Sequence, residues 1–152
     1  MAVINVEVQR TIHRPVAVVS RQFGDIQHHS KNGVHPAIRF TVISEEGDTC
    51  RFRQEVKVIG MLQTDEIVQR RNADGSLDWD VVEGTNKGTR IYQGFTPVGS
   101  DATMVTFRAA APATGIKRVL KPLFAIAIRK AVEKGLEEDR QDLEERGYGK
   151  AG

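Results

Sequence analysis

The chain has 152 residues, 39% of them hydrophobic and 28% charged, which is typical of one ordinary globular domain with a buried core. Its formal net charge is only +2 and it has no interleaved stripe of basic and aromatic residues, so nucleic-acid binding is not expected. No apolar run reaches the roughly 18 residues of a membrane span, and a single cysteine excludes an internal disulfide.

The first segment predicts a strand followed by two short helices. Residues 4–12 alternate apolar and polar side chains, the period of a strand with one buried face. Pro15 suits the first turn of a helix, and Asp25 suits the N-cap of a second helix that ends before His35-Pro36. The N-terminus lacks the basic start and apolar centre of a signal peptide, so we expect a cytoplasmic location.

Six further strands are predicted between residues 38 and 111, where the period of two returns and persists. Turns rich in Gly and Asp recur at roughly 10–15-residue intervals, as in a meander of hairpins. The gaps are too short for crossover helices, so the strands are expected to be antiparallel. The expected strands are 38–42, 50–58, 62–71, 77–82, 91–95 and 103–111.

The last segment predicts one long helix, from Gly115 to about Arg146, which Pro122 should kink or restart. Residues 116–132 are apolar on nearly every side, which indicates burial. Residues 133–146 carry a net charge of −4, leaving +6 for the rest of the chain, and we expect them to form a solvated anchor without chemistry of its own.

This order of elements predicts an α+β fold. A curved seven-stranded antiparallel sheet wraps around a long C-terminal helix, with two short helices between the first two strands. Only the last helix is long and apolar enough to cover the concave face of such a sheet. We expect a single ligand-binding domain over residues 1–147 and a flexible tail over residues 148–152.

Three stretches carry a resemblance to a known family. They are Asp25 after the first helix, the run Lys87-Gly-Thr-Arg-Ile-Tyr before a strand, and Gly115-Ile-Lys-Arg-Val-Leu-Lys-Pro-Leu-Phe at the start of the last helix. With this layout the chain resembles the START-like helix-grip (SRPBCC) superfamily, and most of all its bacterial polyketide cyclase/dehydrase-like and lipid-transport-like branch. The resemblance implies a cavity between sheet and helix that holds a lipid, polyketide, sterol or aromatic molecule. It transfers no catalytic residue, because the shared motifs are architectural.

Four polar residues interrupt apolar strand faces: Gln54, Glu66, Glu83 and Gln93. Burial of such groups is costly without partners, whereas in a cavity they can orient a polar group of a ligand. The alternative is a strand end or a register shifted by one residue, which turns each side chain to the other face. Tyr92 has the opposite parity from Gln93 and is expected to face outward.

The predicted cavity wall combines these polar groups with aromatic side chains and the first half of the last helix. Its members are Phe40, Phe52, Gln54, Glu66, Trp79, Gln93, Phe107, Leu123, Phe124 and Ala127. Ordinary core packing explains the aromatic members equally well.

Neither a metal nor a cofactor is predicted. The sequence has no Gly-rich phosphate loop, paired-cysteine spacing or nucleophile elbow. His28 and His29 would point about 100° apart on a helix and make a poor metal pair. Together with His35 they could form a pH-sensitive or ligand-facing rim, and the alternative is surface or capping positions.

The pattern favours a carrier or sensor of a hydrophobic small molecule. The alternative is a polyketide cyclase or dehydratase that uses Glu66 or Glu83, with a histidine or Arg10, as general acid and base. A third hypothesis is a partner-binding adaptor. Basic residues near the start of the last helix could contact an anionic membrane surface transiently or form a solvated edge: Lys117, Arg118, Lys121, Arg129 and Lys130. The pattern does not indicate an oligomeric state.

Overall fold

The computed structural model describes residues 2–58 and 60–150. Within them, the chain forms seven strands and four helices. In chain order these are β1 (Val3–Ile12), α1 (Val16–Gly24), α2 (Ile26–Asn32), β2 (Ile38–Glu46), β3 (Thr49–Val58), β4 (Met61–Arg71), β5 (Leu77–Gly84), β6 (Arg90–Val98), β7 (Ala102–Pro112), α3 (Ile116–Val119) and α4 (Lys121–Glu144). The predicted α+β helix-grip fold is confirmed.

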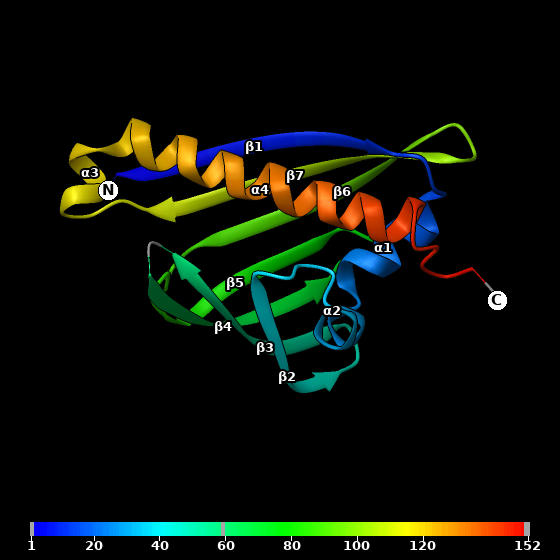
Figure 1. Ribbon diagram of the computed structural model, residues 1–152, viewed down its shortest axis with the longest axis horizontal. Coiled ribbons are helices and arrows are strands. Elements are labelled where there is room, and N and C mark those ends of the chain that lie inside the picture. Colours follow the sequence, from blue (N-terminus) through cyan, green and yellow to red (C-terminus); the bar gives the residue numbers. More distant parts are fainter. Residues whose placement is uncertain (1, 59, 151–152) are drawn as a thin grey trace.

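All seven strands belong to one antiparallel sheet with the order β1-β7-β6-β5-β4-β3-β2. The strands β2 to β7 therefore form the predicted meander, and β1 closes the sheet by pairing with β7. Figure 1 shows α4 running along β1 at one edge of the curved sheet, while α2 packs against β2 at the other edge. The middle strands lie between these two covered edges.

The register assigns each strand residue to one of two faces. On the concave face, Val8 lies opposite Phe107, Phe107 opposite Gln93, and Gln93 opposite Leu77. The alternation breaks between β4 and β5, where Glu66 pairs with Glu83 but Ile67 pairs with Val81. A bulge of this kind reverses the face of every residue beyond it.

Two buried clusters form the core. The first joins β1, β7 and α1 to Leu136 and Leu143 of α4. The second lies under α2 and contains Phe40, Phe52 and Ile67 of the sheet. Because α4 lies along β1, it covers the first cluster and leaves the second to α2.

The predicted roles of the two halves of the last helix are wrong. The buried residues of α4 all lie in its acidic half: Leu136, Asp139, Asp142 and Leu143. In the apolar half, Leu123 is 61% exposed and Val119 of α3 is 79% exposed. A helix over a sheet edge can bury only one narrow side, so the other apolar side chains remain in solvent.

The predicted restart at Pro122 is confirmed. The short helix α3 ends at Val119 and α4 begins at Lys121, with the proline in its first turn, where the missing N–H costs nothing. Among the residues that the structure describes, no helix combines the length and apolar character needed to cross a membrane.

Candidate functional site

Gln93 is the most unusual polar residue of the concave face. Its side chain comes from the middle of β6, is only 2% exposed, and has Leu77 and Phe107 as cross-strand neighbours. Within the described residues, its amide Nε2 has no hydrogen-bond partner. A buried donor without a partner costs about 1–3 kcal/mol, so such groups are uncommon in folded proteins.

Neighbouring polar groups on the concave face do have partners. Gln69 accepts a hydrogen bond from Trp79 Nε1 at 2.7 Å and donates one to the carbonyl of Gly24 at 3.0 Å. The carboxylate of Asp65 accepts bonds from the main-chain and side-chain nitrogens of Asn86, each at 2.7 Å. These residues hold turns and helix ends in place.

Most of the predicted wall residues share the concave face with Gln93. Phe40 and Phe52 are buried, with ring centroids 5.9 Å apart, and Trp79 meets Phe52 edge to face at 5.0 Å. Gln54 and Phe107 are half-buried. Phe124 of α4 is half-buried against the first core cluster. Their contact with a ligand stays a prediction.

Glu66 was expected on the same face, and this expectation is wrong. Its side chain lies on the outer face, where it forms an ion pair with Arg51. Glu83, the other candidate acid, is exposed, and its carboxylate lies 3.4 Å from Lys87 Nζ. The bulge between β4 and β5 explains Glu83, because a strict alternation from Trp79 would have placed it inside.

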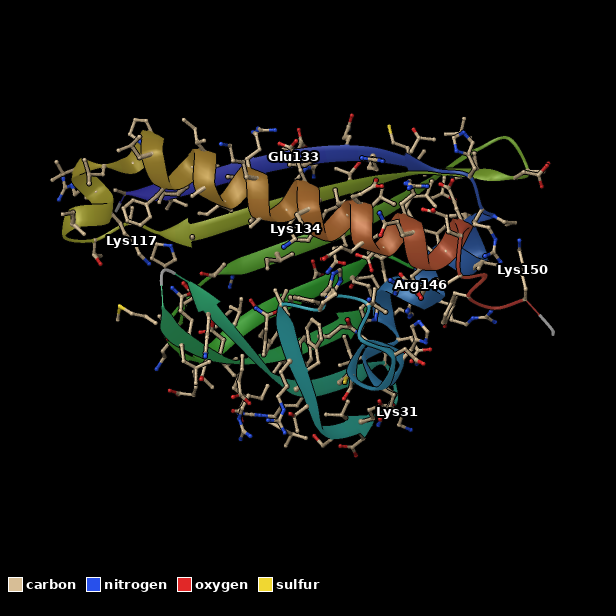
Figure 2. All side chains as sticks on the ribbon, in the orientation of Figure 1. Lys31, Lys117, Glu133, Lys134, Arg146 and Lys150 are labelled. Atoms are coloured by element: carbon tan, nitrogen blue, oxygen red, sulfur yellow. The ribbon has the colours of Figure 1, made fainter. Side chains whose placement is uncertain are left out.

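Leu123 and Ala127 were expected to face the sheet and are exposed instead. Phe124 lies on the covered side of the helix, and Lys117 Nζ is 5.9 Å from the centre of its ring. Figure 2 shows Lys117 on α3, with Glu133 and Lys134 further along α4. Fewer residues of α4 therefore face the sheet than its many apolar residues suggested.

The outer face carries a groove of about 630 Å³ across β1 and β4 to β7. Tyr92 faces outward into it, as predicted, with Arg108 stacked 5.3 Å above its ring. Arg108 is in turn paired with Glu7 at 2.6 Å. A groove lined by ion pairs is poorly suited to an apolar ligand, so the concave face is the better candidate for a ligand site.

A network of histidines and acids joins α4 to α2. Asp139 Oδ1 lies 3.0 Å from His29 Nε2, 3.4 Å from His35 Nε2 and 3.1 Å from Gln22 Nε2. Asp142 Oδ2 lies 2.8 Å from His28 Nε2 and 2.9 Å from the same Gln22 nitrogen. These contacts fasten the acidic half of α4 to the two short helices.

The histidines are also fixed from their other side. His29 Nδ1 lies 2.8 Å from the main-chain carbonyl of Asp25, and His35 Nδ1 lies 2.9 Å from Glu138 Oε1. Asp25 caps α2 by accepting a bond from the main-chain nitrogen of His28, as predicted. Tyr148, from the segment expected to form a tail, donates its hydroxyl to Asp25 Oδ2 at 2.7 Å.

The charges of the network support one another. Burial disfavours a charged ring and lowers the pKa of His35, but hydrogen bonds and charges of Asp139 and Glu138 outweigh it and raise that pKa to about 9. Burial likewise raises the pKa of Asp139, yet bonds from His29 and His35 hold it well below the usual range of an aspartate. At neutral pH the pair is therefore ionic.

The sequence-based interpretation missed this network. It considered a pH-sensitive or ligand-facing rim and surface or capping positions for the histidines, but it gave them no acidic partner, although His29 and His35 are buried. A signal was present: Asp139 shares a helical stripe with Leu136 and Leu143, spaced three and four residues away. An acid between two core leucines requires a buried partner.

Residues 3–144 match the family described as polyketide cyclase / dehydrase and lipid transport. The chain belongs to this family. Its description joins polyketide cyclases and dehydrases with lipid transport, which points to a helix-grip fold that holds hydrophobic molecules. No curated protein matches the sequence.

Solved structures agree with the family assignment. The chain is similar to the protein TTHA0849 from Thermus thermophilus, with 19% identity and a TM-score of 0.79 over 90% of this chain and 94% of that one. It is also similar to the Zhui aromatase/cyclase from Streptomyces sp. R1128, with 16% identity and a TM-score of 0.76 over 96% and 99% of the two chains. A START superfamily protein from Mycobacterium smegmatis has 15% identity and a TM-score of 0.70 over 93% and 95%. At these identities the likeness establishes the fold.

Proposed function

We propose that the protein binds one hydrophobic small molecule between the concave face of the sheet and the first half of α4, and acts as its carrier or sensor. The observation that carries this proposal is the buried amide of Gln93. Its Nε2 would donate a hydrogen bond to a carbonyl or hydroxyl oxygen of the ligand, while the apolar body of the ligand packs against Phe107 and Trp79. Such sites are usually lined by apolar side chains with a small number of polar groups among them.

The positions of the acids favour a carrier over a cyclase or dehydratase. Glu66 and Glu83 do not face the concave side, and Arg10 is paired with Glu137. Asp65 does belong to that side, but both its oxygens bind Asn86. General acid–base catalysis requires a titratable group within reach of the substrate, and these candidates do not provide one.

The exposed apolar residues of α3 and α4 support loading from a membrane surface. Val119, Leu123 and Ile126 are each more than half exposed, and the basic residues Lys117 and Lys121 lie between or beside them in the sequence. Apolar side chains flanked by lysines are the usual composition of a helix that rests on anionic lipid.

Native mass spectrometry of the wild-type protein as purified tests the proposal directly. We expect a retained small molecule that extraction with organic solvent removes. The apo protein is then titrated with 2-naphthol and with naphthalene, in displacement of a fluorescent hydrophobic probe. Replacement Gln93→Leu should weaken 2-naphthol binding about 5- to 10-fold, the value of one hydrogen bond, and leave naphthalene binding unchanged.

The matched control is Gln9→Leu, because Gln9 is exposed and lies on the outer face of β1. It should not alter the affinity for either molecule. Failure of wild-type protein to retain or bind any hydrophobic molecule contradicts the proposal, as does an equal effect of the two variants. Sedimentation with vesicles containing phosphatidylglycerol, but not with pure phosphatidylcholine vesicles, is expected for the membrane contact.

A further inference from the structure

We propose that His29, His35 and Asp139 form a binding site for one divalent transition-metal ion. Each residue offers one ligand atom, a ring nitrogen of each histidine and a carboxylate oxygen of Asp139, and these atoms all lie within 4.8 Å of one another. All three residues are buried. The site borders the concave face at Phe40, whose ring centroid is 5.9 Å from that of His29 and 6.0 Å from that of His35, but the proposal does not depend on the carrier function.

The hydrogen bonds on the far side of each ring fix the tautomers. The carbonyl of Asp25 can only accept a hydrogen bond, so the Nδ1 of His29 carries a proton. Glu138 accepts in the same way from the Nδ1 of His35. When a metal ion displaces the proton from Nε2, the ring becomes neutral and its Nε2 lone pair points toward Asp139. A histidine whose second nitrogen donates to a carbonyl or carboxylate is the usual arrangement around a bound metal.

Three electron-rich atoms therefore converge on one point. These atoms repel one another unless a positive charge lies between them. That charge is supplied either by protons on the histidine rings or by a metal ion. Protons on both Nε2 atoms would make two stacked cations, with ring centroids of His29 and His35 only 5.3 Å apart. A single divalent ion satisfies the two nitrogens and the Asp139 oxygen without that repulsion.

The donor set identifies the class of ion. Two imidazoles and a carboxylate suit Zn²⁺ and its first-row neighbours, whereas Mg²⁺ and Ca²⁺ prefer oxygen ligands. Bonds of about 2.0–2.1 Å to a tetrahedral ion place its ligands about 3.3 Å apart. The distances from Asp139 Oδ1 to the two Nε2 atoms, 3.0 and 3.4 Å, bracket this value.

The ion would act as a structural cross-link. His29 lies in α2, His35 in the segment before β2, and Asp139 in α4, 110 residues after His29 in the sequence. Such ligands come together only in the folded chain, so metal binding would stabilise the position of α4.

The test uses the full chain without an affinity tag, treated with EDTA and then dialysed. Calorimetric titration with Zn²⁺ should show one ion per chain. At a free Zn²⁺ concentration about 100 times the Kd, Tm should rise by about 5 °C or more. Co²⁺ should bind with the same stoichiometry and give visible absorption bands that report its ligands.

Three variants identify the ligands. His29→Gln and His35→Gln, which keep a polar side chain, should each lose at least about 100-fold in Zn²⁺ affinity. Glu138→Gln should keep one ion per chain but bind it about 10- to 100-fold more weakly, since Glu138 acts through His35. The control is His13→Gln, because His13 is exposed and should not change the affinity.

Circular dichroism checks that each variant is folded, and the wild-type titration decides the matter alone if a variant is not. The proposal is overturned if EDTA-treated wild-type protein takes up no stoichiometric Zn²⁺, or if Zn²⁺ leaves its Tm unchanged. It is also overturned if affinity survives in folded His29→Gln and His35→Gln. Protons would then be the positive centre of the cluster.

Discussion

The buried guanidinium of Arg14 donates a hydrogen bond from Nη1 to the main-chain carbonyl of Leu143, in the last turn of α4. The last four carbonyls of a helix have no partner within it, and the positive charge complements the negative end of the helix dipole. Thr103 Oγ1 donates to the carbonyl of Arg14 at 2.9 Å. One residue thus links the end of α4 to the start of β7.

Replacement Arg14→Met should lower the free energy of unfolding by about 2–3 kcal/mol, because a buried carbonyl and a helix end lose a charged partner. Urea denaturation followed by circular dichroism measures this loss. The control, Arg39→Met, removes an exposed arginine and should change the value by less than about 0.5 kcal/mol. Equal effects would contradict the role of Arg14.

Two leucines of the same helix should respond differently to truncation. Leu136 is 2% exposed and packs in the first core cluster, so Leu136→Ala should cost about 2–5 kcal/mol. Leu123→Ala should cost less than about 0.5 kcal/mol, since its side chain is mostly in solvent. Denaturant midpoints of both variants measure the difference. A large loss at Leu123 would show that the first half of α4 is packed in solution.

The apo protein should be stabilised by Gln93→Leu, by about 1 kcal/mol, since the change removes a buried donor without a partner. Gln69→Leu provides the opposite case. It breaks bonds to Trp79 and Gly24 and should destabilise the fold by about 1–3 kcal/mol. Thermal unfolding of both ligand-free variants is the measurement. Destabilisation by Gln93→Leu would indicate that the amide has a structural role.

Burial, followed by the nearby charge of Glu45, raises the pKa of the Cys50 thiol to about 11. Alkylation by iodoacetamide at pH 8 should therefore be slow in the native protein and fast in urea. The native thiol keeps its proton at a pH where the unfolded one has lost it, so unfolding becomes easier as the pH rises from about 9 toward 11. The difference in stability between wild type and Cys50→Ala should shrink or reverse over this range. A pH-independent difference would rule out the shift.

The strands could be predicted because side chains alternate between the two faces over most of each strand and the turns contain Gly and Asp. The alternation also placed Gln93 inside and Tyr92 outside. It failed at Glu83, where one extra residue in β5 reverses the face. A bulge depends on how two strands pair, and the pattern of a single strand does not reveal it.

The last helix shows a second limit of the sequence. Its apolar half was expected to be buried because apolar side chains usually are, but burial depends on where the helix lies over the sheet. The partners of Asp139 and Asp142 come from residues 28–35, more than a hundred positions earlier. From the sequence alone, acidic residues in a helix are expected to be in solvent. Only the folded structure shows that histidines lie against them.

The attachment of α4 is uneven along its length. Arg14 and the histidine network hold its last two turns, whereas α3 and the first turns of α4 present much of their apolar surface to solvent. In the described part of the chain, the first half of α4 is held only by apolar contacts with the first core cluster, from Phe124, Ala125, Ile128 and Val132, so we expect the α3 end to separate from the sheet first. A ligand could therefore enter and leave at the α3 end while every hydrogen bond of the sheet stays intact.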